Sequence, residues 1–94
     1  MEIGRYIVLS TAHVRVETAR LLEEWAKLPA ADQPLAIAST QYGWFVSTHD
    51  ASNKSQGLPP EIAGIVAYGR VHDCTYVLLD CDGPVQAPLP IYPW

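Results

Sequence analysis

The stretch from Pro34 to Thr48 most constrains the fold, because it has the pattern of a β-hairpin in the middle of the chain. Two short apolar runs, Leu35–Ala38 and Trp44–Val46, flank a connection that ends in Gly43. Glycine readily takes the positive φ of a tight connection, so a turn at 41–43 would pair the two runs antiparallel. The alternative is one continuous strand with a bulge at Gly43.

A strand and a helix are predicted on each side of this hairpin. Arg5–Ser10 and Thr75–Asp80 are apolar runs of strand length, whereas Val14–Leu28 and Pro59–Val71 repeat apolar residues with helical spacing. The order β-α-β-β-α-β predicts an α+β, ferredoxin-like fold. Right-handed crossovers then predict a four-stranded antiparallel sheet in the order 4-1-3-2, with both helices on one face. The alternative is a three-stranded α/β layer in which the hairpin does not form.

The first predicted helix has two features that bear on its local contacts. Arg15 stands where a serine or threonine cap is expected before a helix. Glu23 and Lys27 are four residues apart, which predicts a favourable ion pair on the helix surface.

Residues 84–94 are expected to form an extended, Pro-rich C-terminal tail. They include Pro84, Pro88, Pro90 and Pro93, so they cannot form a helix or a fully paired strand. The apolar ending Leu89–Trp94 predicts that this tail covers the sheet face left open by the helices, or contacts a partner. A second copy of the chain is the other candidate cover, so the sequence also predicts self-association as a homodimer.

Composition indicates one globular domain, residues 1–94, in the cytoplasm. Apolar residues make up 49 % of the chain and charged residues 17 %, which excludes a disordered protein. No apolar run reaches the roughly 18 residues of a membrane helix, and no signal peptide is recognised. The net charge is −4 and the basic residues are scattered, which argues against direct nucleic-acid binding. If Cys74 and Cys81 share a strand they lie about 23 Å apart, too far for a disulfide, and free thiols fit the cytoplasm.

A polar group is predicted where the end of the first strand meets the start of the last. The group consists of His13, His72, Asp73 and Cys74. These side chains would suit a small ligand-binding or metal-dependent enzyme, but they lack a close ligand motif such as Cys-x-x-Cys. The preferred interpretation is therefore structural, with His13 and its neighbours capping the first helix and Cys74 packed as an apolar residue.

A second polar group, Asp80-Cys81-Asp82, places two carboxylates two residues apart at a strand end. Paired carboxylates can bind a divalent cation, but Asp-Gly-Pro at 82–84 is also ordinary turn chemistry, which we prefer. Cys81 has no basic neighbour in sequence that would make it a nucleophile. We accordingly predict no catalytic residue, no metal and no cofactor.

Four aromatic residues are the candidate partner-binding residues: Tyr42, Trp44, Tyr92 and Trp94. Tyrosine and tryptophan are favoured at protein interfaces because they bury a large area and keep a polar group. Packing in the core is the alternative. With the acidic composition, they predict a small non-enzymatic protein-interaction module that binds a host protein or itself.

Several short motifs resemble a family of short bacterial proteins of unknown function that are often encoded on integrative elements and plasmids. They are Ser10–His13, the Leu21-Leu22 pair with Trp25, Tyr42–Val46 and Leu89–Tyr92. The resemblance covers most of the chain, and Tyr-Gly-Trp-Phe is its most specific piece. It implies a cytoplasmic accessory protein of a mobile genetic element and supplies no catalytic residue. Inhibition of a host defence complex, as by anti-CRISPR proteins, is one concrete version of that role.

Overall fold

The computed structural model describes residues 1–49 and 57–94, and its elements follow the predicted order. The strands are β1 (Tyr6–Ser10), β2 (Ile37–Ser39), β3 (Gly43–Ser47) and β4 (Tyr76–Asp80). The helices are α1 (Val16–Lys27) and α2 (Pro60–Val71), and two short 3-10 helices are η1 (Thr11–His13) and η2 (Ala30–Asp32). The chain is therefore an α+β domain, as predicted.

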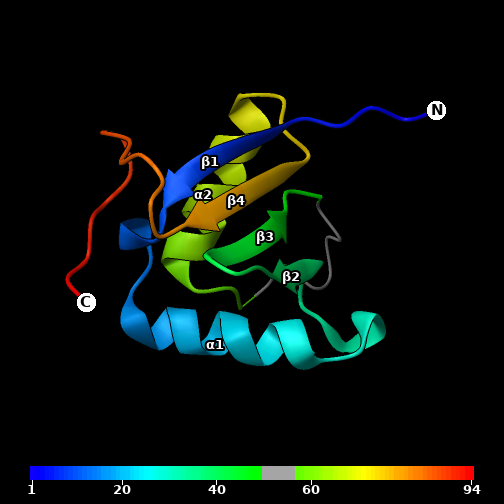
Figure 1. Cartoon of the computed structure of the whole chain (residues 1–94), viewed down its shortest axis with the longest axis horizontal. Helices are drawn as coiled ribbons and strands as arrows, with labels where there is room; N and C mark the ends of the chain where they lie inside the picture. The colour runs from blue at the N-terminus through cyan, green and yellow to red at the C-terminus, as the bar shows by residue number, and fades with distance from the viewer. Residues whose placement is uncertain (50–56) are drawn as a thin grey trace.

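The four strands form one mixed sheet in the order β1-β4-β3-β2 (Figure 1). β1 and β4 pair in parallel, whereas β3 pairs antiparallel with both β4 and β2. Three strands thus run in one direction and β3 runs in the other. The prediction of an antiparallel sheet in the ferredoxin-like order 4-1-3-2 is therefore wrong, and the difference lies in the place and direction of β4.

The order of the strands was predicted wrongly because the first and last apolar runs of the sequence are alike. The prediction assumed that α2 carries the chain over to a strand parallel to β3, whereas α2 returns it to an antiparallel neighbour. Tyr6–Leu9 and Tyr76–Leu79 have nearly the same apolar pattern, so either run suits the centre of a sheet. In the structure β4 is central, with Val77 and Leu79 fully buried, and β1 lies at the edge.

The predicted hairpin is confirmed, and with it the three-stranded alternative is excluded. Ile37 of β2 pairs with Val46 of β3, and the side-chain oxygen of Thr40 accepts a hydrogen bond from the backbone N–H of Gly43 at 3.0 Å. Gly43 does not have a positive φ. Its role is different, because a Cβ atom there would lie 1.7 Å from the carbonyl oxygen of Leu79 in β4.

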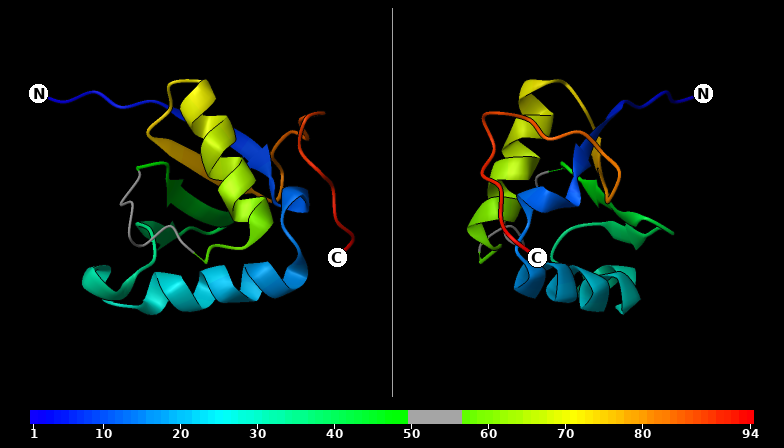
Figure 2. Two further views of the ribbon diagram at one scale, coloured as in Figure 1. Left: turned by 180° about the vertical axis from the view of Figure 1, so that it is seen from behind. Right: turned by 60° about the vertical axis from the view of Figure 1, so that its left-hand side comes forward.

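One apolar core fills the space between the sheet and the two helices (Figure 2). Its most buried members are Leu9, Val46, Val77 and Leu79 of the sheet, Val14 before α1, Leu22 of α1, and Ile62 and Ile65 of α2. Burial of each such side chain is worth about 1.5–3 kcal/mol relative to exposure. α2 lies across the inner face of the sheet, and α1 runs along its β2 edge (Figures 1 and 2).

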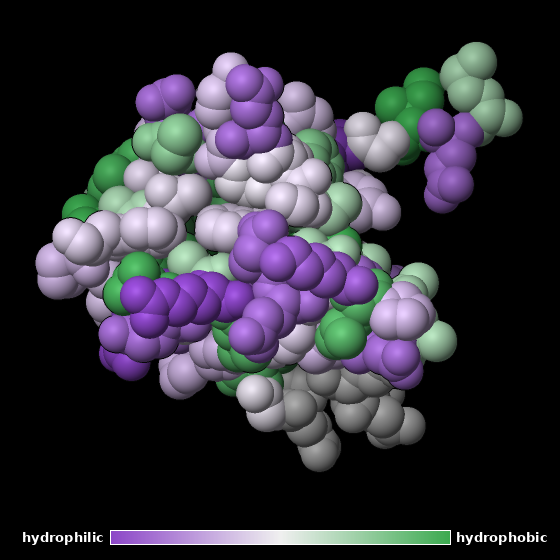
Figure 3. Space-filling view, turned by 60° about the horizontal axis from the view of Figure 1, so that its bottom comes forward, coloured by the Kyte–Doolittle hydropathy of each residue, from purple (hydrophilic) through white to green (hydrophobic). Residues whose placement is uncertain are grey.

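α1 is amphipathic around this core, and α2 also buries one face in it. The exposed residues of α1 are Glu17, Arg20, Glu24 and Lys27. Figure 3 shows the side of the molecule that carries α1, where hydrophilic side chains extend over the surface. The predicted apolar face of α2 is buried, and Gly69 permits the close approach of Thr48, whose Cγ2 would lie 2.7 Å from an added Cβ atom.

The start of α1 is capped by the other helix. Arg15 precedes the helix and makes no side-chain cap, in line with the missing serine or threonine. The carboxylate of Glu61, in the first turn of α2, instead accepts hydrogen bonds from the backbone N–H of Arg15 at 3.3 Å and the hydroxyl of Thr18 at 3.0 Å. One buried acid therefore satisfies two donors and ties the two helix starts together.

The outer face of the sheet carries a strip of aromatic rings, and neither α1 nor α2 lies over it. Phe45 lies between Tyr6 and Tyr76, with ring centroids 5.1 Å and 5.5 Å apart. Tyr6 is 54 % exposed and Tyr76 is 42 % exposed. Residues 84–94 were expected to cover this face, and that expectation is not confirmed.

Residues 84–94 lie instead beside η1, at the end of the sheet where β1 and β4 finish (Figure 1, orange to red). They contain no helix or strand. Residues 86–89 form a turn, in which the N–H of Leu89 donates to the carbonyl of Gln86 at 3.0 Å. The N–H of Tyr92 donates to the carbonyl of Ala12 at 2.8 Å. This C-terminal segment therefore packs on the chain that connects β1 with α1.

Candidate functional site

His13 is a buried link between η1 and the C-terminal segment. Its Nε2 atom accepts a hydrogen bond from the backbone N–H of Gln86 at 3.0 Å, so its Nδ1 atom must carry the proton. Nδ1 then donates to the carbonyl oxygen of Pro90 at 2.8 Å. With 1 % of its surface exposed, His13 holds the C-terminal segment in place as a neutral imidazole.

The structure does not bring the other three members of the predicted polar group to His13. His72, Asp73 and Cys74 lie between α2 and the start of β4, and His13 follows the end of β1. Because β1 and β4 are parallel, the end of β1 meets the end of β4, and the start of β4 is one strand length away, about 16 Å. The expected meeting of these side chains depended on an antiparallel β4.

Each of these three residues has a local structural place. The ring of His72 packs on Tyr68 with centroids 4.6 Å apart, and Asp73 takes a positive φ of 57° after the end of α2. Cys74 is buried, as the structural interpretation predicts. Cys81 is exposed, and both cysteines are free.

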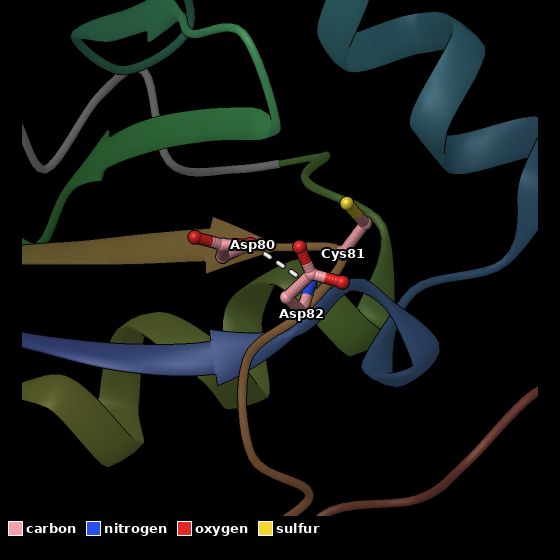
Figure 4. Close-up of side chains that lie close together, drawn as sticks. All are labelled: Asp80, Cys81 and Asp82. Atoms are coloured by element: carbon pink, nitrogen blue, oxygen red, sulfur yellow. Dashed lines mark hydrogen bonds between the residues drawn. The ribbon is translucent and has the colours of Figure 1, made fainter.

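Asp80, Cys81 and Asp82 do come close to one another at the end of β4 (Figure 4). The carboxylate and thiol atoms of the three side chains lie within 4.8 Å of one another. The backbone N–H of Asp82 donates to the side chain of Asp80 at 2.8 Å, and the N–H of Gly83 donates to the carbonyl of Asp80 at 2.9 Å. These hydrogen bonds belong to a turn and account for the arrangement, so we assign no metal site to it.

Three of the four aromatic residues predicted to contact a partner line one cleft. We call it the aromatic cleft and define it by Glu23, Tyr42, Trp44, Cys81 and Trp94. Its volume is about 260 Å³. Tyr42 is 52 % exposed and Trp94 is 62 % exposed, whereas Trp44 is half-buried at the base of the hairpin turn. Three distant parts of the chain therefore meet here, namely α1, the β2–β3 turn and the C-terminal segment.

The polar atoms of the two tryptophans hold their rings in this cleft. Nε1 of Trp44 donates to the Glu23 carboxylate at 2.9 Å, and Nε1 of Trp94 donates to the carbonyl of Val14 at 2.8 Å. On the other side, the N–H of Cys81 donates to the carbonyl of Tyr42 at 3.0 Å, which joins the turn to the end of β4. The two tryptophan rings are thus fixed by contacts with α1 and with Val14, the residue that follows η1.

Glu23 does not form the predicted surface pair with Lys27. Over residues 1–49 and 57–94, the ion pair that forms is Arg15 with Glu61, at 3.7 Å. Within those residues no lysine, arginine or histidine pairs with Glu23, whose carboxylate contacts Trp44 instead. The aromatic cleft therefore contains a carboxylate that pairs with no basic side chain of the described residues.

Tyr92, the fourth predicted aromatic residue, lies outside the cleft. The guanidinium carbon of Arg15 is 4.9 Å from the centroid of its ring, a cation–π distance. This contact holds the C-terminal segment on the start of α1, two residues before Trp94 enters the cleft.

Comparison with known families gives a match over most of the chain. The C-terminal domain of a family of unknown function, DUF5983, matches residues 6–94. The chain belongs to this family. Membership in a family of unknown function agrees with the resemblance found in the sequence. No curated protein and no solved structure matches the DUF5983 domain described here.

Two further observations complete the description of this DUF5983 domain. In the part of the chain that the structure describes, no helix is both long and apolar enough to span a membrane.

Glu23 is the cleft residue that the sequence analysis missed, because that analysis placed it in a surface ion pair with Lys27. No local pattern connects it with Trp44, which lies 21 residues further along the chain.

Proposed function

We propose that this domain is a non-enzymatic protein-interaction module whose partner contacts the aromatic cleft. The observation that carries the proposal is the convergence of Tyr42, Trp44 and Trp94 on one cleft. Two of these rings are more than half exposed, and both tryptophans are fixed by hydrogen bonds to the protein. Rigid, exposed aromatic side chains are the commonest hot spots of protein interfaces.

The alternative, a small ligand-binding or metal-dependent enzyme, has less support. It needs His13, His72, Asp73 and Cys74 in one site, and His13 lies one strand length from the other three. Moreover, both ring nitrogens of His13 are occupied by backbone groups of the C-terminal segment.

The partner we propose is a protein of the host cell, and the domain acts in the cytoplasm as an accessory protein of a mobile genetic element. Inhibition of a host defence complex, comparable to that by anti-CRISPR proteins, is one concrete form of this role. Its support is the resemblance at Tyr42–Val46 and the net charge of −4. The free thiols of Cys74 and Cys81 are in keeping with a reducing compartment.

Site-specific photo-crosslinking in the cells that naturally encode the protein tests this proposal. A benzoylphenylalanine at position 42 places the photoreactive group in the aromatic cleft. The same group in place of Val71, which is 79 % exposed at the end of α2, is the matched control. We expect one protein to be captured from position 42 and not from position 71. Equal capture from both positions, or none from position 42, contradicts the proposal.

A further inference from the structure

We propose that the aromatic cleft receives an arginine side chain from a basic segment of the partner protein. This inference rests on the proposed function and names the chemistry that the partner must supply. Its two components are the exposed aromatic residues Tyr42 and Trp94 beside Trp44, and the carboxylate of Glu23. Aromatic faces and a carboxylate together attract a cation.

The size of the cleft selects one side chain over a larger ligand. Its volume of about 260 Å³ is below the roughly 300–1,000 Å³ of pockets that hold small molecules and cofactors. A single long side chain, entering from a peptide backbone that stays outside, fits this volume.

The charge of the cleft selects a cation. Among the described residues, Glu23 has no basic partner, and its Oε2 atom is held by Trp44. The chain as a whole carries a net charge of −4, which favours the approach of a basic segment over an acidic one. An anionic or purely apolar side chain would leave the Glu23 carboxylate without a cationic partner among the described residues.

Planarity selects arginine over lysine. A guanidinium group stacks flat on aromatic rings and also donates several hydrogen bonds to a carboxylate in the same plane. The molecule already contains one contact between a guanidinium group and an aromatic ring, where the Arg15 guanidinium carbon lies 4.9 Å from the ring centroid of Tyr92. The proposed contact pairs the same two kinds of group between two proteins.

The first experiment titrates the protein with N-acetyl-arginine methylamide and, as a neutral isostere, N-acetyl-citrulline methylamide. The readout is the nuclear magnetic resonance signal of the indole N–H of each tryptophan. We expect saturable shifts at Trp44 and Trp94 with a Kd in the millimolar range, and no saturation with citrulline. We expect no shift at Trp25, which packs against the core. Equal shifts with the citrulline compound overturn the proposal.

Two isosteric variants separate charge from structure. Glu23→Gln removes the charge and keeps an oxygen that can accept the hydrogen bond of Trp44, whereas Glu24→Gln makes the same change at the exposed neighbouring position. We expect Glu23→Gln to weaken arginine binding by about two- to fivefold and Glu24→Gln to leave it unchanged. Equal weakening by both variants overturns the proposal. A melting temperature close to that of the wild type confirms that each variant is folded.

The exposed thiol of Cys81 gives an independent measure, because it lies in the cleft while Cys74 is buried. Two methanethiosulfonate reagents are compared, one that carries a cationic trimethylammonium group and one that carries an anionic sulfonate group. The rate at which each reagent modifies Cys81 is divided by its rate with a small free thiol. The Asp80 and Asp82 carboxylates lie within 4.8 Å of this thiol and favour the cationic reagent in every variant, so the test is the change on substitution. We expect the preference for the cationic reagent to fall by about two- to fivefold in Glu23→Gln and not in Glu24→Gln. An unchanged preference in Glu23→Gln, or an equal fall in both variants, overturns the proposal.

These outcomes are distinct from those of the crosslinking experiment. A protein captured from position 42, together with no arginine binding, overturns the arginine contact and leaves the interaction module standing. Arginine binding with no captured protein overturns the interaction module instead.

Discussion

Replacement of Gly43 by alanine is expected to disrupt the pairing of β3 with β4 at the start of β3. An added Cβ atom would lie 1.7 Å from the carbonyl oxygen of Leu79 and 2.8 Å from its carbonyl carbon, which are both backbone atoms. Since ordinary contact begins near 3.4 Å, β3 and β4 must separate by about 1.7 Å at this point.

The magnitude follows from the contacts that this separation would break. The pair between Gly43 and Asp80 opens, and the hydrogen bond from the N–H of Cys81 to the carbonyl of Tyr42 is lost. Each backbone hydrogen bond is worth about 0.5–1.5 kcal/mol, and loosened core packing adds to this. We therefore expect the free energy of unfolding to fall by about 2–4 kcal/mol, against a total of about 5–14 kcal/mol for a chain of this length.

Thermal and urea unfolding followed by circular dichroism measure this loss, and Gly64→Ala is the matched control. Gly64 lies in α2 with no atom within 4 Å of an added Cβ, so alanine should raise the free energy of unfolding by up to about 1 kcal/mol. The melting temperature of Gly43→Ala should fall by roughly 10–25 °C. Equal stability of the two variants would refute the close approach of β3 and β4.

Three further predictions concern other contacts. His13→Ala removes a buried side chain with two hydrogen bonds, so the free energy of unfolding should fall by about 2–4 kcal/mol. Limited proteolysis should also cut residues 84–94 faster, and an unchanged rate of cleavage contradicts the link between His13 and the C-terminal segment. Glu61→Leu leaves two donors without an acceptor and should lower the free energy of unfolding in urea by about 2–3 kcal/mol, whereas Glu61→Gln should lower it by under about 1 kcal/mol. Equal losses in the two variants would show that the charge of Glu61, and not its hydrogen bonds, stabilises the fold. Self-association through the strip of aromatic rings on the outer face of the sheet should appear as concentration-dependent sedimentation, and it should disappear in Tyr76→Ser. A protein that stays monomeric at all concentrations contradicts this prediction.

The elements of the fold could be predicted from the sequence because they depend on local patterns. The second helix was expected at Pro59–Val71 and occurs at Pro60–Val71, and the hairpin has its turn before Gly43. The order of the strands could not be predicted, because two runs of similar pattern compete for the centre of the sheet. Periodicity determines which side chains face the core, not which strand lies next to which.

The candidate site was only partly predictable for the same reason. Tyr42, Trp44 and Trp94 were selected by residue type alone, and their meeting in one cleft depends on the path of the C-terminal segment. That path depends on several long-range contacts, among them those of His13, whose partners lie 73 and 77 residues further along the chain. The role of Glu61 as a cap for α1 likewise depends on a contact that spans 43 residues.

The central claim is that the aromatic cleft, and not the outer face of the sheet, contacts the partner. Isothermal titration calorimetry with the protein captured from position 42 tests it with two tyrosines of nearly equal exposure, Tyr42 at 52 % and Tyr6 at 54 %. We predict that Tyr42→Ala weakens binding about tenfold or more, whereas Tyr6→Ala changes the Kd by less than about twofold. A large loss of affinity in Tyr6→Ala with wild-type binding by Tyr42→Ala would contradict the account.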